Sequence, residues 1–386
     1  MKYIDRLLQG APVEWYPLGE VAEIKRGKRL VKSELNAYGD YAVYQNSMTP
    51  LGYYHKSNVD EDTSFIISAG SAGEIGYSTN KFWAADDVYY FLGSTDLSSK
   101  YLYYYLLTKQ PQIKGHVRRA SVPRLSRKAF EKLPIPIPPV AVQEEVVRVL
   151  DKFTALEAEL EAELDCRKRQ YRYYRDALLT FDLSPSDGLC HSPLFPAPFA
   201  VEWRSLGEVG EICMCKRILK EQTSESGEIP FYKIGTFGGV ANSYISRELF
   251  TEYRSKYRYP KVGDILISAS GTIGRTVVFD GTDAYFQDSN IVWIDNDERL
   301  VTNRFLYYYY QVIQWSVAKG GTIQRLYNDA IKKAPIPIPP LAVQERIVEI
   351  LDKFDTLVNS ISEGLPREIE LRRKQYEYYR DALLSF

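Results

Sequence analysis

Two segments of the chain carry apolar side chains at alternating steps of four and three residues, the spacing of a coiled-coil helix. Each pattern predicts a long rod, and two rods paired antiparallel would cover each other's apolar seam. The expected seam positions of the first rod are Leu150, Phe153, Leu160, Leu164, Tyr171, Tyr174 and Leu178. Those of the second are Leu351, Phe354, Val358, Ile361, Leu365, Ile369, Tyr376, Tyr379 and Leu383.

The two rods are copies of one sequence, and the second is four residues longer. From Leu133 to Phe153, 15 of 21 positions are identical to those 201 residues later. Tyr171 to Phe181 returns as Tyr376 to Phe386, now 205 residues later, with nine of 11 positions identical. Four residues make nearly one helical turn, so the insertion predicts a stutter in a continuing helix, with a kink at Gly364 and Pro366.

The divergent segments that precede the rods alternate short apolar runs with glycine turns, which is typical of compact strand-rich domains. They are distant copies, because Val13-Glu-Trp15 returns as Val201-Glu-Trp203. A tyrosine-rich stretch in each segment, Tyr101 to Leu107 and Phe305 to Tyr310, predicts a helix packed on the strands.

A Pro-Ile-Pro-Ile-Pro-Pro run precedes each rod and predicts a stiff, extended connector, because proline lacks the amide hydrogen that a helix needs. The sequence as a whole predicts an α+β fold in which two strand-rich globular domains are joined by two long antiparallel coiled-coil helices in a pseudo-two-fold repeat. The expected parts are a globular domain (1–132), a connector and helix (133–182), a Pro- and Ser-rich linker (183–200), a second globular domain (201–333), and a second connector and helix (334–386).

Charge is segregated along the chain, although the net charge of its 386 residues is only −1. Residues 1–132 hold 18 Lys and Arg against 14 Asp and Glu, and residues 200–333 hold 17 against 16, whereas both helical segments are acidic. A polyanion would therefore meet the first globular domain most readily. No apolar run reaches the length of a membrane span and the first residues lack the pattern of a signal peptide, so we expect a cytoplasmic protein.

Residues suited to catalysis or metal binding are sparse. The chain has four cysteines and three histidines, and Cys213-Met-Cys215 has the wrong spacing for a zinc or redox pair. There is no phosphate-binding loop and no Asn/Asp-Pro-Pro-aromatic motif, and Glu23-Ile-Lys25 lacks the upstream Pro-Asp of a nuclease. We expect no catalytic residue and no metal site in this chain.

Basic and polar side chains in the globular segments are better candidates, for contacts with nucleic acid. Lys and Arg neutralise phosphates, while Arg reads guanine and Asn or Gln reads adenine in the major groove. Arg124 and Arg325 share the 201-residue offset, which favours a common role such as phosphate anchoring. A structural turn or a solvated basic surface is the alternative for each candidate. The candidates are Lys25, Arg26, Lys28, Arg29, Gln45, Asn46, Ser47, Arg118, Arg119 and Arg124 in the first segment, and Lys216, Arg217, Lys233, Thr236, Arg275, Gln287, Gln324 and Arg325 in the second.

The paired Pro-Ile-Pro-Ile-Pro-Pro, Ala-Val-Gln-Glu, Leu-Asp-Lys-Phe and Tyr-x-Tyr-Tyr-Arg-Asp-Ala-Leu-Leu segments resemble the central and distal conserved regions of the specificity subunit of Type I restriction-modification enzymes. The resemblance covers the whole chain. It implies two target recognition domains that each read one half of a split DNA sequence, with the helices as spacer. It also implies docking of two methyltransferase subunits, which carry S-adenosylmethionine, and of restriction subunits that use ATP and Mg²⁺, while this chain holds no cofactor and catalyses nothing.

Two hypotheses from other classes of protein stay open. One is a symmetric scaffold whose globular ends bind protein, and the other is a nuclease or methyltransferase with degenerate motifs. Contact with phosphates makes affinity fall steeply with salt and contact with protein need not, so salt dependence separates the scaffold from a DNA reader. Activity of the isolated chain with DNA and cofactors tests the enzyme.

Overall fold

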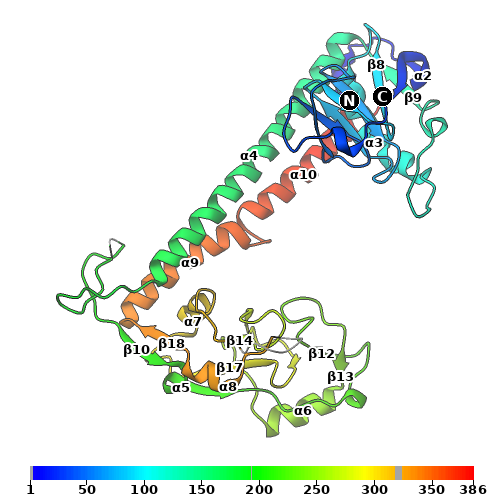
Figure 1. The fold of residues 1–386 in the computed structure, drawn as a ribbon. Coiled ribbons are helices and arrows are strands. Elements are labelled where there is room, and N and C mark those ends of the chain that lie inside the picture. The colour runs from blue at the N-terminus through cyan, green and yellow to red at the C-terminus, as the bar shows by residue number, and fades with distance from the viewer. Residues whose placement is uncertain (1–2, 193, 318–323) are drawn as a thin grey trace. The chain divides into compact units, whose positions relative to one another are not determined.

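The computed structural model describes residues 3–192, 194–317 and 324–386, and the chain divides into two compact units (Figure 1). Unit 1 consists of Met1–Ala162 and Arg367–Phe386, and unit 2 of Glu163–Pro366. Each unit holds one strand-rich domain and one antiparallel pair of helical segments. Within the described residues, no helix is both long and apolar enough to cross a membrane.

The strand-rich domain of unit 1, hereafter the first domain, contains a four-stranded and a three-stranded sheet. The first sheet has the order β2 (Ala22–Arg26), β8 (Val88–Gly93), β5 (Thr63–Ile67) and β6 (Ile75–Ser78), and the second has the order β4 (Gly52–Tyr54), β3 (Tyr41–Tyr44) and β7 (Phe82–Ala84). The helices are α1 (Tyr3–Leu8), α2 (Leu18–Val21) and α3 (Ser99–Gly115), with short 3₁₀ turns η1 (Lys32–Glu34) and η2 (Arg127–Ala129). The tyrosine-rich α3 packs on β5 and β6, as the sequence predicts.

The strand-rich domain of unit 2, hereafter the second domain, repeats this topology. Its sheets have the orders β11 (Gly210–Cys213), β17 (Ile291–Asn296), β14 (Ile265–Ser268), β15 (Thr276–Val278), and β13 (Tyr244–Ile245), β12 (Ile229–Tyr232), β16 (Tyr285–Phe286). The helices are α5 (Leu206–Val209), α6 (Arg247–Lys256), the tyrosine-rich α7 (Asn303–Tyr309) and α8 (Asn328–Lys333), with the 3₁₀ turn η3 (Lys220–Gln222). The matching strand orders confirm that the divergent segments are copies.

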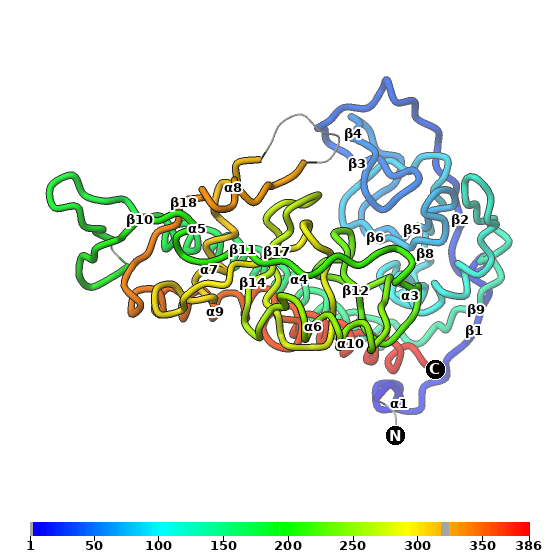
Figure 2. Tube along the Cα trace, turned by 90° about the horizontal axis from the view of Figure 1, so that it is seen from below, coloured from blue at the N-terminus to red at the C-terminus, as the bar shows by residue number. Residues whose placement is uncertain are grey.

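The two proline runs are strands as well as connectors. β9 (Pro134–Ile137) pairs antiparallel with β1 (Glu14–Pro17), and β18 (Pro335–Ile338) pairs in the same way with β10 (Glu202–Ser205) (Figure 2). Proline is tolerated because each ladder has only two strands and its missing amide can face outward. The extended geometry was expected, whereas the pairing with the opening residues of each domain was not.

The long helices pair antiparallel inside each unit. The helices are α4 (Val140–Leu179), α9 (Leu341–Asn359) and α10 (Gly364–Leu383). In unit 1, α4 packs on α10, where Phe153 stacks on Tyr379 with ring centroids 5.2 Å apart. In unit 2, α4 packs on α9, where Tyr174 stacks on Phe354 at 5.4 Å. The two stacks are the same pair in the two copies, which confirms the expected antiparallel seam.

The expected seam positions are buried or half-buried with two exceptions. Tyr379 keeps its stack on Phe153 although it is 39% exposed, and Ile361 is 83% exposed. The assignment of Ile361 to the seam is wrong, because this residue lies between α9 and α10 rather than on a helix.

Four residues, Ser360–Glu363, stand between two separate helices, so the predicted stutter in a continuing helix is also wrong. α9 ends at Asn359 and α10 begins at Gly364, whose φ of +75° is a left-handed conformation that favours glycine. The Ser360 hydroxyl accepts a hydrogen bond from the Glu363 amide at 3.1 Å. Such local side-chain bonds compete with helical ones, so the helix breaks instead of unwinding.

Candidate nucleic-acid interface

The strands of the first domain bring predicted basic residues to one end of the four-stranded sheet. In the register of β2 and β8, Arg26 lies opposite Tyr89, and Ala22 lies opposite Gly93 at the other end. β5 finishes on the same side as Arg26, because its last residue, Ile67, pairs with the first residue of β8. The loops after β2 and β5 therefore leave the sheet together, and we call this side the loop end.

A third loop, after β3, joins the loop end through main-chain hydrogen bonds. The Lys28 amide donates to the Ala84 carbonyl, and the Ala85 amide donates to the Tyr44 carbonyl, each with an N···O distance of 2.9 Å. Ala84 and Ala85, which precede β8, thus bond to the basic loop on one side and to the residue before the Gln45–Ser47 loop on the other.

The second basic run reaches the same place. The Ser71 amide donates to the Asn46 carbonyl at 2.9 Å, and the Gly70 amide donates to the Pro123 carbonyl at 3.1 Å. Arg124, the next residue, forms a bridge with the chain just before Gly70. Three stretches of candidates that are far apart in sequence, 25–29, 45–47 and 118–124, are therefore neighbours in the structure.

Most of the gathered cations are available to a ligand. Lys25 pairs with Glu23 at 3.1 Å, and the Arg26 Nε donates to the Asp86 carbonyl at 2.7 Å. The other cations of the loop end are exposed and have no carboxylate at ion-pair distance in the part of the chain that the structure describes. These are Lys28, Arg29, Arg118, Arg119 and Arg124.

The polar candidates of this domain divide into two kinds. The Ser47 hydroxyl donates to the Thr49 carbonyl at 2.8 Å, which is a turn role. The Asn46 side chain is exposed, and only its main-chain carbonyl is engaged by Ser71. Gln45 is half-buried at the same turn. Asn46 is therefore better placed than Ser47 to face a ligand.

The second domain builds the same end. Ser270 forms a bridge with Arg325, just as Ala69 does with Arg124, and both members of each pair are displaced by 201 residues. The equivalence of the two arginines, expected from their offset, holds in the structure. Arg325 lies with its guanidinium carbon 5.9 Å from the ring centre of Tyr327.

Several candidates of the second domain hold its own loop together. The Thr236 hydroxyl accepts from the Lys233 amide at 3.2 Å, and Gln287 Oε1 accepts from the Ile234 amide at 3.0 Å. Arg275 donates to the carbonyl of the residue that follows Thr236, at 2.8 Å. Thr236 and Gln287 thus have the structural role that was the alternative for them, while the Lys233 ammonium lies 5.8 Å from a phenyl ring.

A dibasic pair recurs in the two loop ends. Lys28-Arg29 and Lys216-Arg217 are separated by 188 residues, the same offset that relates β2 to β11 and η1 to η3. All four side chains are exposed, and the Lys216 ammonium lies 5.2 Å from the Tyr257 ring. Gln324 is exposed as well. The sequence contained this offset, but the divergence of the domains hid it.

Glycines shape the hairpin that contacts each arginine. Gly70 and Gly271 have φ values of +74° and +66°, and Gly73 and Gly274 have +88° and +79°. These left-handed angles favour glycine, which explains why the two positions survive in both copies. The expectation of glycine turns after the apolar runs is confirmed for Gly70 and Gly73 but is wrong for Gly76, which lies within β6.

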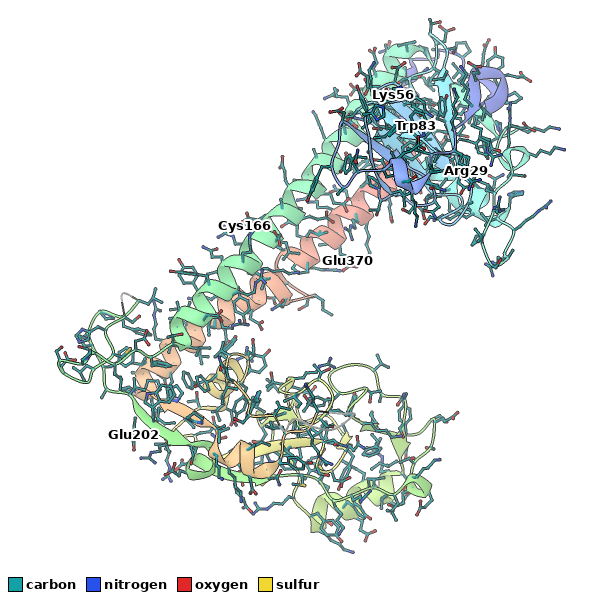
Figure 3. The ribbon with its side chains drawn as sticks, in the orientation of Figure 1. Arg29, Lys56, Trp83, Cys166, Glu202 and Glu370 are labelled. Atoms are coloured by element: carbon teal, nitrogen blue, oxygen red, sulfur yellow. The ribbon has the colours of Figure 1, made fainter. Side chains whose placement is uncertain are left out.

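Trp83 is a neighbour of the basic loop that the sequence did not reveal. Its Nε1 donates to the Lys28 carbonyl at 2.9 Å, and its ring lies 5.1 Å from that of Tyr54. Figure 3 labels it with Arg29 and Lys56 on the first domain. No periodic signal connects Trp83 with Lys28, because main-chain hydrogen bonds such as that from the Lys28 amide to the Ala84 carbonyl bring the basic loop to the end of β7.

The opposite end of the first domain is acidic. A groove of about 650 Å³ lies beside the proline strand and the ends of α2 and β8, and the described residues that line it include Glu14, Glu20 and Asp96 but no lysine or arginine. Carboxylates repel phosphate, so the charge of the domain favours the loop end as the side that faces a polyanion.

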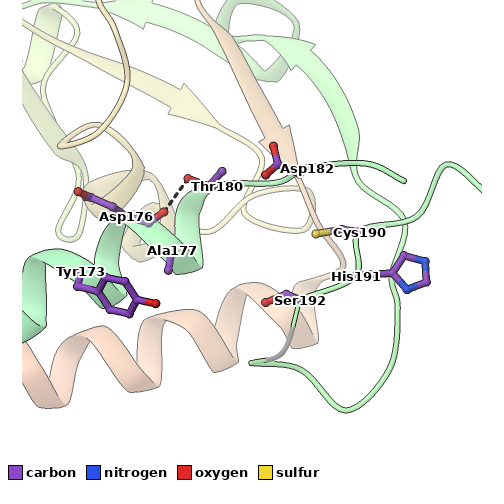
Figure 4. A pocket seen from close by; sticks show the side chains of 8 residues that line it. All are labelled: Tyr173, Asp176, Ala177, Thr180, Asp182, Cys190, His191 and Ser192. Atoms are coloured by element: carbon purple, nitrogen blue, oxygen red, sulfur yellow. Dashed lines mark hydrogen bonds between the residues drawn. The ribbon is translucent and has the colours of Figure 1, made fainter. Parts of the chain in front are cut away.

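A pocket of about 440 Å³ in unit 2 brings together residue types suited to reactive chemistry, because Cys190, His191 and Asp182 are among the residues that line it (Figure 4). Burial raises the pKa of the Cys190 thiol. The His191 Nε2 bonds to Asp187 at 2.8 Å, and Figure 4 shows its ring pointing away from Cys190. The thiol is thus not paired with His191. Among the described residues, no cluster of His, Cys, Asp and Glu has the arrangement of a metal site.

The fold and the site together define a protein of two homologous strand-rich domains, each with a cationic loop end. The family model described as "Type I restriction modification DNA specificity domain" matches this chain twice, over residues 12–165 and 199–371. The chain therefore belongs to the Type I restriction-modification specificity subunit family and carries two recognition domains.

Individual relatives agree over the full length. A putative type I restriction enzyme specificity subunit of Haemophilus influenzae is 49% identical, with 100% of this chain and 98% of the relative aligned. The EcoR124I/EcoR124II specificity subunit of Escherichia coli is 34% identical over 100% of this chain and 97% of its own. The crystal structure of an S subunit from M. genitalium shares the fold, with a TM-score of 0.61 at 15% identity over 97% of this chain and 96% of that chain.

Proposed function

We propose that this chain is the DNA sequence-recognition subunit of a Type I restriction-modification complex, in which each recognition domain reads one half of a bipartite target. The observation that carries the proposal is the recurrence of one cationic loop end in two domains of divergent sequence. Lys28-Arg29 with Arg124 in the first domain corresponds to Lys216-Arg217 with Arg325 in the second.

The recurring cations and the variable residues have different tasks in this proposal. Contacts to phosphate position a protein on the duplex, while contacts to base edges specify the sequence. The recurring dibasic pairs and arginines would bind phosphates. The residues that differ between the domains, such as Asn46 and Arg118 in the first and Lys233 in the second, would read bases. Different base-contacting residues on the same domain fold would recognise two different half-sites.

The paired helices would serve as the spacer between the half-sites. The seam of α4 with α10 and with α9 is built from the repeated stacks Phe153–Tyr379 and Tyr174–Phe354. Side chains that interlock in this way resist sliding, so the helices can hold a set gap between the halves of the target.

The helices would also dock two methyltransferase subunits. Tyr173 and Tyr378 occupy the same position in the two copies and are both 69% exposed. Exposed aromatic residues on an otherwise charged surface are common at protein interfaces. Two equivalent surfaces suit two copies of one partner. These partners would carry S-adenosylmethionine, and restriction subunits with ATP and Mg²⁺ would join them, whereas this chain would bind no cofactor and catalyse no step.

Sequencing of methylated bases tests the proposal directly. Cells that carry this chain with the methyltransferase subunit of its own system should show one methylated motif made of two short specific halves and a gap of fixed length. Cells with the methyltransferase subunit alone should show none. An undivided motif, or methylation without this chain, would contradict the proposal.

Salt dependence separates DNA reading from the scaffold hypothesis. We expect the logarithm of the affinity of the assembled complex for its target to fall linearly with the logarithm of the salt concentration. A flat dependence would favour a protein scaffold. Methylation or cleavage by the isolated chain, supplied with DNA and cofactors, would instead favour the enzyme hypothesis.

A further inference from the structure

A glutamine at the start of each long helix is fully buried. In unit 1, Gln143 Nε2 donates to the Asp96 carbonyl at 2.7 Å and to the Pro138 carbonyl at 2.9 Å. Its Oε1 accepts from the Ser98 amide at 3.0 Å. Ser98 is the N-cap of α3, so one side chain of α4 binds the proline strand and the helix of the recognition domain at the same time.

The second copy repeats each of these bonds. Gln344 Nε2 donates to the Leu300 carbonyl at 3.0 Å and to the Pro339 carbonyl at 2.9 Å, and its Oε1 accepts from the Thr302 amide at 2.9 Å. Thr302 is the N-cap of α7. The recognition domains have diverged, yet this junction has kept its geometry.

The hydrogen bonds of both glutamine side chains go to main-chain groups. Asp96 and Ser98 in the first domain correspond to Leu300 and Thr302 in the second, so the side chains differ while the bonded atoms are the same. A junction that uses only the main chain does not depend on the sequence of the recognition domain. The junction can therefore attach recognition domains of different sequence to the helix in the same orientation.

A carboxylate two helical turns further on strengthens the junction of the first domain. Asp151 accepts from the Tyr104 hydroxyl at 2.6 Å and from the Lys100 ammonium at 2.7 Å, both of α3. Burial and this bond raise the pKa of Tyr104, so the hydroxyl stays a donor.

The second copy has the same arrangement with a different cation. Asp352 accepts from the Tyr308 hydroxyl at 2.5 Å and from Arg304 Nε at 2.8 Å, both of α7. In each unit, two polar anchors thus fix the helix of the recognition domain against the spacer helix.

We infer that Gln143 and Gln344 are positioning residues that fix the orientation of each recognition domain on its spacer helix, and that this rigidity restricts the gap between half-sites that the subunit accepts. The inference rests on the proposed function. One base pair more or less moves a half-site by about 3.4 Å and turns it by about 34° around the duplex. A rigidly held domain cannot follow that change, whereas a loosened one can.

The test compares affinities of the complete complex for two duplexes, one with the natural gap and one with the gap changed by one base pair. Gln143→Met keeps the size of the side chain and removes its hydrogen bonds, which leaves the amide of Ser98 and two carbonyls without their partner. We expect the ratio of the two affinities to fall at least fivefold in this variant, and equally in Gln344→Met. Glu144→Gln, an exposed neighbour, is the matched control and should keep the ratio of the unchanged chain.

The ratio is independent of how much of the protein is folded, because both duplexes are measured on one sample. Gln143→Asn keeps the amide on a side chain one methylene shorter and should also lower the ratio, and it supplies the measurement if the methionine variant yields no folded complex. An unchanged ratio in these variants would overturn the inference while the proposed function stands. A lack of gap preference in the unchanged chain would instead overturn the proposed function.

Discussion

Arg124→Ala should remove one phosphate contact from the complex with DNA and do little else. The side chain is exposed and has no carboxylate partner in the described part of the chain, so no ion pair has to break before it binds DNA. Each phosphate contact contributes about 0.9 to the slope of log K against log salt. We expect the slope to become shallower by about 0.9 in Arg124→Ala, by the same amount in Arg325→Ala, and by about 1.8 in the double variant.

The slope is measured by fluorescence anisotropy of a labelled target duplex, titrated with the assembled complex at salt concentrations between about 50 and 200 mM, over which such complexes lose much of their affinity. Across this roughly fourfold change in salt, one lost contact alters the change in affinity by about 3.5-fold. Arg299→Ala is the matched control, because Arg299 is 90% exposed, pairs with Asp297 at 2.8 Å and follows β17 at the end away from the loops. Equal slopes for Arg124→Ala and the unchanged chain, or an equal loss in Arg299→Ala, would refute the assignment of the loop end.

Three further predictions concern the helices and the tyrosines. Phe153→Ala removes the stack on Tyr379 and should lower the free energy of unfolding by about 2–3 kcal/mol, which is less than the loss of a fully buried phenylalanine costs. Urea unfolding followed by circular dichroism measures this change, and a value below about 0.5 kcal/mol would contradict the packing. Deletion of Ser360–Glu363 should alter the permitted gap, because these residues join the two helical segments α9 and α10, and should leave both half-sites as they are, because they lie outside the recognition domains. Sequencing of methylated bases reports the gap and the half-sites, and a changed half-site would contradict this expectation. Burial raises the pKa of Tyr105 and of Tyr309 from 10.0 to about 12, so their contribution to stability is complete below pH 10 and is lost as the pH rises towards 12. Melting temperatures should fall across this pH window, and a melting temperature that does not change with pH would show that these hydroxyls ionise freely.

The fold could be predicted from the sequence wherever a pattern was repeated. The rods, their antiparallel seam and the duplication of the domains follow from the copied segments, because two matching periodicities constrain each other. The break at Ser360–Glu363 could not be predicted in this way. A four-residue insertion preserves the apolar period, so the pattern continues as if the helix did, and only the local hydrogen bond of Ser360 and the left-handed Gly364 end it.

The candidate site was predictable in its charges but not in its neighbours. Basic residues can be counted along a sequence, and Arg124 and Arg325 were matched by their offset. The approach of Asn46 to the second basic run depends on main-chain bonds between loops, which leave no mark on residue identity. The role of the buried Gln143 was hidden for the same reason, since its side chain hydrogen-bonds to main-chain atoms, whose positions the sequence does not reveal.

Exchange of one recognition domain is the most direct test of the claim that each of the two equivalent domains recognises one half of the target. Residues 1–132 would be replaced by the corresponding residues of the Haemophilus influenzae relative, and the methylated motif would be sequenced in cells that carry the methyltransferase subunit. We predict that one half-site changes while the other half-site and the gap are retained. A change in both half-sites, or in the gap, would contradict the division of the target between the two domains.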